Sequence, residues 1–423
     1  GGRTRCRAAG AVSGAEMGAT RPELARDLFF TRWGTRVSAP IPVLFRCWFG
    51  DSTATERAGN PLDSAAIAAA GRDGASSGGG NMIREWIVRK QLSRLRGAWV
   101  GACLALVATV FGQSAKAASF TIFDPVGSIC TQSRSINRLG QVAGVYTDAV
   151  FAQHGFVRAL DGTITSFDPP GSQGGTFVSS INDNGTIAGY FRDTNGNTHG
   201  FARTPEGTFT LFDPEGSVAT IPLSINSNGA IAGYYTDTHG GNHGFVRSLR
   251  GKMRTFDFPG TNNAAGQAID AMGAITGNYF DGSGVFHGFV RKSDGTFTSF
   301  DPAGSGYTLG STINRGGIVA GLYYDARQGH GFVRTVDGTV ASFDPPGSAL
   351  TLARGINRRG AVVGYYYDSS NVPHGFVRSP HGKIKAFDPQ GSIDTFVSGI
   401  NDDGTITGNY LDGIMEHGFL RTP

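Results

Sequence analysis

The chain has 423 residues, of which 65 are glycine and only 17% are charged, a composition that favours a turn-rich, all-β protein over a helical one. Residues 1–118 hold 16 Lys/Arg and 8 Asp/Glu, which leaves 21 and 25 for residues 119–423, a net charge of −4. The second segment therefore has no overall positive field that would attract nucleic acid, and we expect no nucleic-acid partner. Its one cysteine, Cys130, excludes an intramolecular disulfide and a metal site built from several cysteines there.

Residues 1–81 are rich in Gly, Ala and Arg and show no sustained apolar period. They precede an export signal that starts at Met82, and such signals work best at the start of a chain. We predict that residues 1–81 are an upstream, non-native extension and that translation begins at Met82. A genuine disordered extension is the alternative.

Residues 82–118 have the features of a signal peptide. A basic stretch is followed by the uncharged apolar run Gly97–Phe111 and by a small-x-small pattern that ends at Ala117. Cleavage near Ala117 or Ala118 would yield a secreted or periplasmic bacterial protein that meets the membrane only during export. The alternatives are an uncleaved anchor, although 15 residues are short for a span of about 20, and a lipoprotein attached through Cys103.

The remainder, residues 119–423, is a tandem repeat with four landmarks that recur every 43 to 45 residues. These landmarks are a Phe-Asp-Pro variant, an Ile-Asn pair, a glycine inside an apolar stretch and a His-Gly-Phe triplet. The aspartates of the first landmark are Asp124, Asp168, Asp213, Asp257, Asp301, Asp344 and Asp388. The histidines of the last are His154, His199, His243, His287, His330, His374 and His417.

A period of about 44 residues without a helical pattern is typical of the four-stranded blade of a β-propeller. In one repeat we expect strand a at 178–182, strand b at 186–191, strand c at 199–203 and strand d at 208–212. Pairs such as Asp337-Gly338 between strands c and d predict two-residue hairpin turns.

The ends of the repeat region predict how the fold closes. The region starts with an isolated strand d, Phe120–Phe123, and stops after a strand c, His417–Arg421. Pairing these two strands would remove two exposed sheet edges. We therefore predict a closed seven-bladed β-propeller over residues 119–423, in which the N-terminal strand completes the last blade. An open β-solenoid is the alternative, although it would need capping units.

The Ile-Asn-x-x-Gly stretch followed by His-Gly-Phe, as in His243-Gly244-Phe245, resembles the bacterial extracellular repeats of the HAF family. Those repeats carry His-Ala-Phe, so all seven triplets of this chain match a variant. The resemblance covers residues 119–423 and implies a propeller-like fold and export. It implies no particular activity.

Residues that recur in every repeat are expected to serve the fold. We predict that each repeated His bonds the Asp that closes strand d, as His330 with Asp344, and that Phe332 lies opposite Phe343. The Arg that follows each triplet, from Arg158 to Arg421, is expected to contact a neighbouring blade or the rim. A ring of metal or catalytic sites is the alternative interpretation of the repeated His and Asp residues.

Residues that break the repeat are better candidates for binding, because variable loops on a rigid scaffold often carry specificity. The predicted d–a loops hold Arg134, Phe177, Tyr307, Arg354 and Phe396, and the predicted b–c loops hold Phe151, Phe286, Arg327 and Glu416. A weak metal candidate is formed by Asp193, Asn195 and Asn197, whose alternating oxygens resemble the start of a calcium loop without its later acidic ligand.

The sequence carries no recognisable nucleophile, nucleotide or zinc motif. We therefore expect a monomeric, cofactor-free module that binds or scaffolds an extracellular polysaccharide, surface component or protein through one propeller face. One alternative is a carbohydrate-active lyase or hydrolase with a site at the central channel. Another is a purely structural repeat. An enzyme would need an asymmetric cluster of ionisable groups in one pocket.

Overall fold

The computed structural model of the protein describes residues 118–173 and 175–423. The predicted extension and signal peptide, residues 1–118, thus lie outside the described residues apart from Ala118. All regular elements from Ser119 to Thr422 are β-strands. No helix in this described part is long and apolar enough to cross a membrane.

The strands follow the predicted a, b, c, d order. The a-strands are β2 (Ser128–Ile136), β6 (Thr176–Ile181), β10 (Ser217–Ile225), β14 (Ala264–Ile269), β18 (Tyr307–Ile313), β22 (Ser348–Ile356) and β26 (Asp394–Ile400). The b-strands are β3 (Val142–Asp148), β7 (Ile187–Arg192), β11 (Ile231–Asp237), β15 (Ile275–Phe280), β19 (Val319–Tyr324), β23 (Val362–Asp368) and β27 (Ile406–Leu411). The c-strands are β4 (Gln153–Arg158), β8 (Thr198–Arg203), β12 (Asn242–Arg247), β16 (Phe286–Arg291), β20 (Gly329–Arg334), β24 (Pro373–Arg378) and β28 (Glu416–Thr422). The d-strands are β1 (Ser119–Phe123), β5 (Ile164–Phe167), β9 (Phe209–Phe212), β13 (Met253–Phe256), β17 (Phe297–Phe300), β21 (Val340–Phe343) and β25 (Ile384–Phe387).

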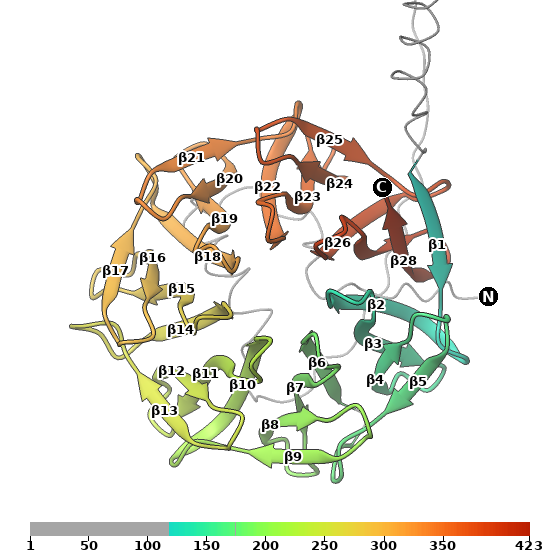
Figure 1. Ribbon diagram of the computed structural model, residues 1–423, viewed down its shortest axis with the longest axis horizontal. Helices are drawn as coiled ribbons and strands as arrows, with labels where there is room; N and C mark the ends of the chain where they lie inside the picture. The colour runs from blue at the N-terminus through green and yellow to red at the C-terminus, as the bar shows by residue number, and fades with distance from the viewer. Residues whose placement is uncertain (1–117, 174) are drawn as a thin grey trace, which may run out of the picture. The chain divides into compact units, whose positions relative to one another are not determined.

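Antiparallel pairing groups these strands into four-stranded units. The first unit contains β2–β5, and the last contains β26–β28 with β1 as its fourth strand. Figure 1 shows the units arranged around a common centre, with the a-strands innermost and the d-strands outermost. Single parallel bridges, such as Cys130 with Glu416, join some neighbouring units. The result is two sheets of eight strands and one of twelve, none of which closes on itself.

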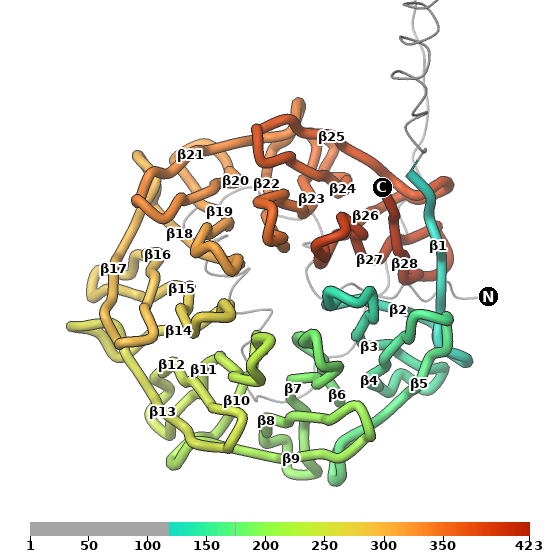
Figure 2. The backbone as a smooth tube through the Cα atoms, viewed as in Figure 1, coloured from blue at the N-terminus to red at the C-terminus, as the bar shows by residue number. Residues whose placement is uncertain are grey.

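The two ends of the described chain meet in one unit. β1 pairs antiparallel with β28, with Phe120 opposite Arg421 and Phe123 opposite Gly418. Figure 2 shows the blue-green N-terminal strand beside the red C-terminal strand. The ring of Phe120 also packs on Phe419, with centroids 5.7 Å apart. The predicted pairing of Phe120–Phe123 with the last strand c is therefore confirmed.

Phenylalanines of the repeat join each unit to the next. The Phe of every His-Gly-Phe triplet has no exposed surface. Each packs edge-on against the Phe of the preceding Phe-Asp-Pro variant, as Phe332 on Phe300, with centroids 5.6 to 6.5 Å apart. The Arg after each triplet lies over the same ring at 4.6 to 5.2 Å. The predicted contact of this Arg with a neighbouring unit is confirmed.

The Ile-Asn-x-x-Gly motif forms the turn between strands a and b. The Oδ1 atom of Asn182 accepts the amide hydrogens of Asn184 and Thr186 at 3.1 and 2.9 Å. Gly185 takes a φ of 80°, in the left-handed region that favours glycine. The motif thus fixes a tight turn and points the next strand back along the first.

The predicted register of the c–d hairpin is wrong by one residue. Gly331 lies opposite Phe343, and Phe332 lies opposite Ser342. The turn is longer than two residues because the amide of Thr335 donates to Thr339 and Gly338 adds a left-handed residue with φ of 95°. This register places His330 directly beside Asp344.

Candidate functional site

One face of the molecule carries the repeated histidines, each held between two aspartates. Nδ1 donates to the Asp that follows strand d at 2.6 to 2.8 Å in all seven units. Nε2 lies 3.2 to 3.7 Å from the Asp that ends strand b or follows it. The predicted His–Asp hydrogen bond is confirmed, and it includes His417 with Asp124 from opposite ends of the repeat region.

A protonated imidazole in this arrangement can donate from both ring nitrogens. Partial burial of His330 alone would lower its pKa, but the hydrogen bonds and charges of Asp344 and Asp325 outweigh burial and raise it. Asp325 in turn accepts the amides of Gln328 and Arg327, which lower its pKa. A metal ligand would need an unprotonated ring nitrogen, so the arrangement suits a loop clamp better than a metal site.

The centre of the molecule contains a cavity of about 200 Å³. Every a-strand contributes to its lining, and one position recurs: the third residue before the Asn or Asp of the Ile-Asn landmark. The residues at this position are Arg134, Ser179, Leu223, Gln267, Ser311, Arg354 and Ser398. Two units therefore have an arginine at a position where the other five have an uncharged side chain.

Both arginines are half-buried and make hydrogen bonds to neutral groups. Arg134 donates to Oε1 of Gln132 at 2.7 Å, and Arg354 donates to the hydroxyl of Tyr365 at 3.0 Å. Burial lowers the pKa of Arg134, and the nearby charge of Arg354 adds to this effect. Arginine nonetheless stays protonated in proteins. The cavity thus holds two mutually repelling cations, and its described lining includes no Asp or Glu.

A buried carboxyl group lies next to Arg134. Glu416 is 3% exposed. Its Oε2 accepts from Cys130 at 2.9 Å and from Gln132 at 3.0 Å, and its Oε1 accepts from Asn409. Burial raises the pKa of Glu416, although these hydrogen bonds and the charge of Arg134 oppose the rise. This network has no equivalent in the repeat pattern and makes the junction between β2 and β28 different from the other junctions.

The structure corrects the predicted positions of most variable residues. Five residues assigned to d–a loops lie in a-strands instead: Arg134, Phe177, Tyr307, Arg354 and Phe396. The cause is a short turn after Asp-Pro, in which Ser348 donates to Pro345 and immediately begins β22. Phe286 and Glu416 begin c-strands and are buried, so they do not lie in b–c loops.

The remaining two variable residues lie as predicted. Phe151 and Arg327 are in exposed b–c loops. The aromatic members of the set mostly pack against neighbours, as Phe177 stacks on Tyr190 at 4.7 Å and Phe286 contacts Tyr307 at 5.0 Å. Only Arg134 and Arg354 of the nine line the central cavity.

The weak metal candidate is not supported by the side-chain arrangement. Oδ1 of Asp193 accepts the backbone amides of Asn195 and Asn197, and Oδ2 accepts the side-chain amides of both residues at 3.5 and 3.1 Å. The asparagines therefore present N–H donors to the carboxylate, where a calcium site would present oxygens. Across residues 118–173 and 175–423, no group of three His, Cys, Asp or Glu could hold a metal ion.

Sequence reasoning missed Gln132 and Asn409, which hold Glu416 in place, and the serines that surround the cavity. An alignment of the repeats could have found the cavity position, since arginine appears there twice among smaller residues. It could not have shown that this position faces the centre.

No protein-family model matches the chain, and no curated protein matches it. Among solved structures, a catalytically inactive virginiamycin B lyase from Staphylococcus aureus is 17% identical, with 72% of this chain and 99% of that chain covered and a TM-score of 0.49. A structure from a study of two prolyl endopeptidases is 13% identical, with 68% and 47% covered and a TM-score of 0.50. The β-propeller domain of the Trilobed protease from Pyrococcus furiosus is 10% identical, with 70% and 94% covered and a TM-score of 0.49. The chain has an all-β fold with propeller-like structural neighbours. At these identities the likeness concerns the fold alone.

Proposed function

We propose that residues 119–423 form a closed seven-bladed β-propeller of the HAF type and that the protein is exported. Three observations support closure. β1 pairs with β28, Phe123 packs on Phe156 as the other Phe–Phe junctions do, and all a-strands line one cavity. Export is supported by the signal-peptide features of residues 82–118 and by the change from a net positive charge before residue 118 to a net negative charge after it.

We further propose that the protein is a binding module whose central channel takes an anionic group of an extracellular polysaccharide. The observation that carries this proposal is that Arg134 and Arg354 share one small cavity whose described lining includes no acidic residue. Guanidinium groups bind carboxylates and sulfates through paired hydrogen bonds. A bound anion would also relieve the repulsion between the two arginines, which favours an anionic ligand over a neutral one.

The surrounding residues fit this role. Ser311 and Ser398 line the same cavity and can donate to an anion, whereas the hydroxyl of Ser179 already donates to the carbonyl oxygen of Pro222 at 2.7 Å. Glu416 is turned toward Cys130, Gln132 and Asn409, so its hydrogen bonds are satisfied within the protein. The guanidinium groups are therefore the main charges that a ligand in the channel would meet.

A second candidate function is a lyase or hydrolase with its site in the same channel. Arg134 and Arg354 line the channel, Tyr365 accepts a hydrogen bond from Arg354, and Glu416 is linked to Arg134 through Gln132. This asymmetric group of ionisable residues favours the enzyme hypothesis. The burial of Glu416 and its three hydrogen bonds argue for a positioning role instead. If the protein cleaved an acidic polysaccharide into fragments with unsaturated or new reducing ends, the enzyme hypothesis would be correct.

Calorimetric titration of the protein with oligogalacturonate tests the binding proposal. Arg134→Met and Arg354→Met should each weaken binding by about 10-fold or more, and affinity should fall with added salt. Arg327→Met is the matched control, since Arg327 is an exposed arginine of a b–c loop. If both channel variants bound oligogalacturonate as tightly as Arg327→Met does, there would be no anion site in the channel. The same conclusion would follow if the parent protein bound a neutral oligosaccharide with the same affinity as oligogalacturonate.

A further inference from the structure

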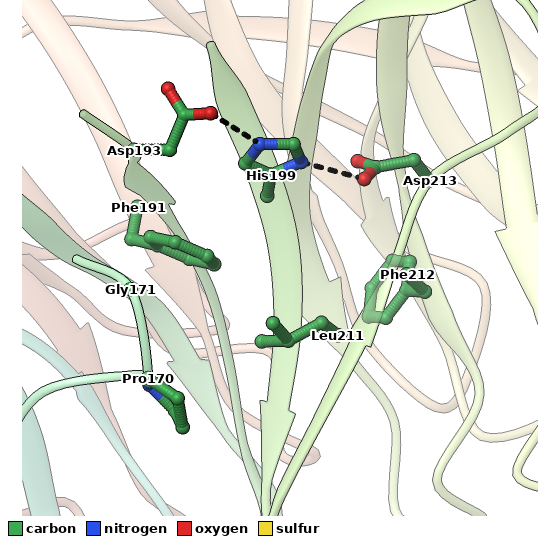
Figure 3. Close-up of a pocket in the computed structure, with 8 residues that line it drawn as sticks. All are labelled: Pro170, Gly171, Phe191, Asp193, His199, Leu211, Phe212 and Asp213. Carbon is green, nitrogen blue, oxygen red and sulfur yellow. Dashed lines mark hydrogen bonds and ion pairs between the residues drawn. The ribbon is translucent and has the colours of Figure 1, made fainter. Parts of the chain in front are cut away.

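A second cavity, of about 370 Å³, opens beside His199 on the face that carries the His–Asp pairs. Figure 3 shows Phe191, Leu211 and Pro170 around this space, with His199 and Asp213 at its edge. No residue of its lining belongs to the central cavity. Its walls are thus apolar, and its polar groups lie on one side.

In the unit of this cavity, both members of a tyrosine–serine pair that two other units form are apolar. A tyrosine occupies the position of Phe191 in the other units, and its ring packs on the histidine. These tyrosines are Tyr146, Tyr235, Tyr279, Tyr323, Tyr366 and Tyr410. In two units the tyrosine hydroxyl bonds a serine of strand d, as Tyr279 with Ser299 at 3.0 Å and Tyr323 with Ser342 at 2.9 Å.

Phe191 and Leu211 stand in place of that pair, so the polar contact is absent. Phe191 is buried beneath the cavity, and Leu211 presents apolar surface to it. Leu211 is 45% exposed. The histidine beside it is also the most open of the seven, with 31% of the His199 side chain exposed against 15 to 27% in the others. Exposed apolar surface next to accessible polar groups is typical of small-ligand sites.

The carboxylate of Asp213 keeps capacity for a ligand. Its Oδ2 accepts from His199 at 2.7 Å, and its Oδ1 accepts only a long contact from the amide of Gly200 at 3.4 Å. The equivalent Oδ1 atoms of Asp168 and Asp344 accept threonine hydroxyls at 2.5 and 2.6 Å. A carboxylate oxygen has about two lone-pair sites, so Asp213 can accept hydrogen bonds from hydroxyl groups of a ligand.

We propose that this cavity binds a neutral monosaccharide residue, which would place its C–H face on Leu211 and Pro170 and donate hydroxyl hydrogens to Asp213. The volume lies within the range of small-molecule sites. The two aspartates at its edge disfavour anionic ligands, so the site selects a different class of ligand from the central channel. A glycan that carries both neutral and acidic residues could engage both sites.

Calorimetric titration of the full chain with the methyl glycosides of glucose, galactose, mannose and fucose tests the proposal. We expect saturable binding of at least one glycoside at one site per chain. The double change F191Y/L211S rebuilds the tyrosine–serine pair of other units and should weaken binding by about 10-fold or more, equivalent to about 1.4 kcal/mol. The melting temperature of this variant should stay close to that of the parent protein, because the new hydroxyls can bond each other.

Two control variants separate binding at this cavity from binding elsewhere on the protein. Y323F/S342L makes the reciprocal change in another unit and should leave the affinity of the first site unchanged. R134M/R354M removes the channel cations and should also leave glycoside binding unchanged, even if the anion proposal fails. Absence of saturable binding for all four glycosides, or undiminished binding in F191Y/L211S, would overturn the proposal.

Discussion

Asp270 occupies the one Ile-Asn slot that lacks asparagine. In other units the amide of this asparagine bridges to the next unit, as Nδ2 of Asn226 donates to the carbonyl oxygen of Asp270 at 2.8 Å. Asp270 still accepts the turn amides as the asparagines do, since its Oδ1 accepts hydrogen bonds from the backbone amides of Met272 and Ala274. An ionised carboxylate cannot donate, so the bridge towards Asn314 lacks its donor.

Asp270→Asn should therefore raise the free energy of unfolding at neutral pH by about 0.5 to 1.5 kcal/mol, the usual net value of one hydrogen bond. Burial already raises the pKa of Asp270, which shows that its charged form is disfavoured. Urea denaturation measures the change. Asn226→Asp, which introduces the same defect in another unit, should lower stability, and a stability loss in Asp270→Asn would contradict the bridging role.

The histidine clamps predict how stability depends on pH. Asp partners raise the pKa of six of these histidines above 6.5, although partial burial opposes them. A raised pKa stabilises the folded state below pH 6.5, and this contribution is lost as pH rises through the folded-state pKa. The urea midpoint should therefore fall as the pH rises above 6.5.

His330→Ala tests one clamp. It should lower the free energy of unfolding by about 1 to 3 kcal/mol and should flatten the pH dependence above neutrality. His239→Ala is the control, because that side chain is 90% exposed. A variant that lost a measurable activity while keeping its stability would instead assign His330 to a functional site.

Among the strands, the b-strand glycine is the most constrained element of the repeat. A Cβ atom on Gly321 would overlap the carbonyl oxygen of Leu309 on β18 and would lie 2.8 Å from the ring of Phe332 on β20. A side chain is thus excluded first by the Leu309 carbonyl oxygen and also by the ring of Phe332.

Gly321→Ala should destabilise the protein by about 1 to 3 kcal/mol, the usual cost of overpacking, as measured by chemical denaturation. Gly306→Ala provides a matched control, since its added Cβ would meet nothing within 4 Å. If the two variants had similar free energies of unfolding, the close contacts around Gly321 would not limit the stability of the protein.

The strands themselves follow closely from the sequence, because a 44-residue period with Asn-x-x-Gly and Asp-Gly turns leaves few ways to place four strands. The c–d register does not follow, because turn length depends on whether Gly338 or its neighbour adopts a left-handed conformation. The start of the a-strands also escaped prediction. The Asp-Pro turn ends sooner than its Gly- and Ser-rich sequence suggests, so residues expected in loops belong to strands.

At the scale of the whole molecule, the candidate site depends on tertiary structure that a linear pattern does not contain. Arg134 and Arg354 stand out as departures from the repeat, yet the sequence places them in loops. A register shift between Ser133 and Ser135, repeated between Ala353 and Gly355, changes the side of the strand on which each arginine lies. The same shift occurs in all seven a–b pairs and has no recognisable sequence signal, so the sequence alone identified the residues but not the channel.

The β1–β28 pair makes a strong prediction about the N-terminal strand. Deletion of residues 119–124 removes a hydrogen-bonded d-strand, the Asp124 partner of His417 and the Phe123 partner of Phe156. The variant should melt at a lower temperature and should aggregate through the exposed edge of β28, as light scattering would show. Deletion of residues 1–81 is the control and should leave the melting temperature unchanged.

The proposed anion site requires a closed ring, because an open arc has no single channel in which Arg134 and Arg354 could act together. Hydrogen–deuterium exchange of the unmodified protein tests closure most directly. If the ring is closed, the amides of residues 120–123 should exchange as slowly as those of other outermost strands such as β5, which is also paired along one edge. Fast exchange of residues 120–123 beside a protected β28 would contradict the closed propeller and, with it, the proposed channel.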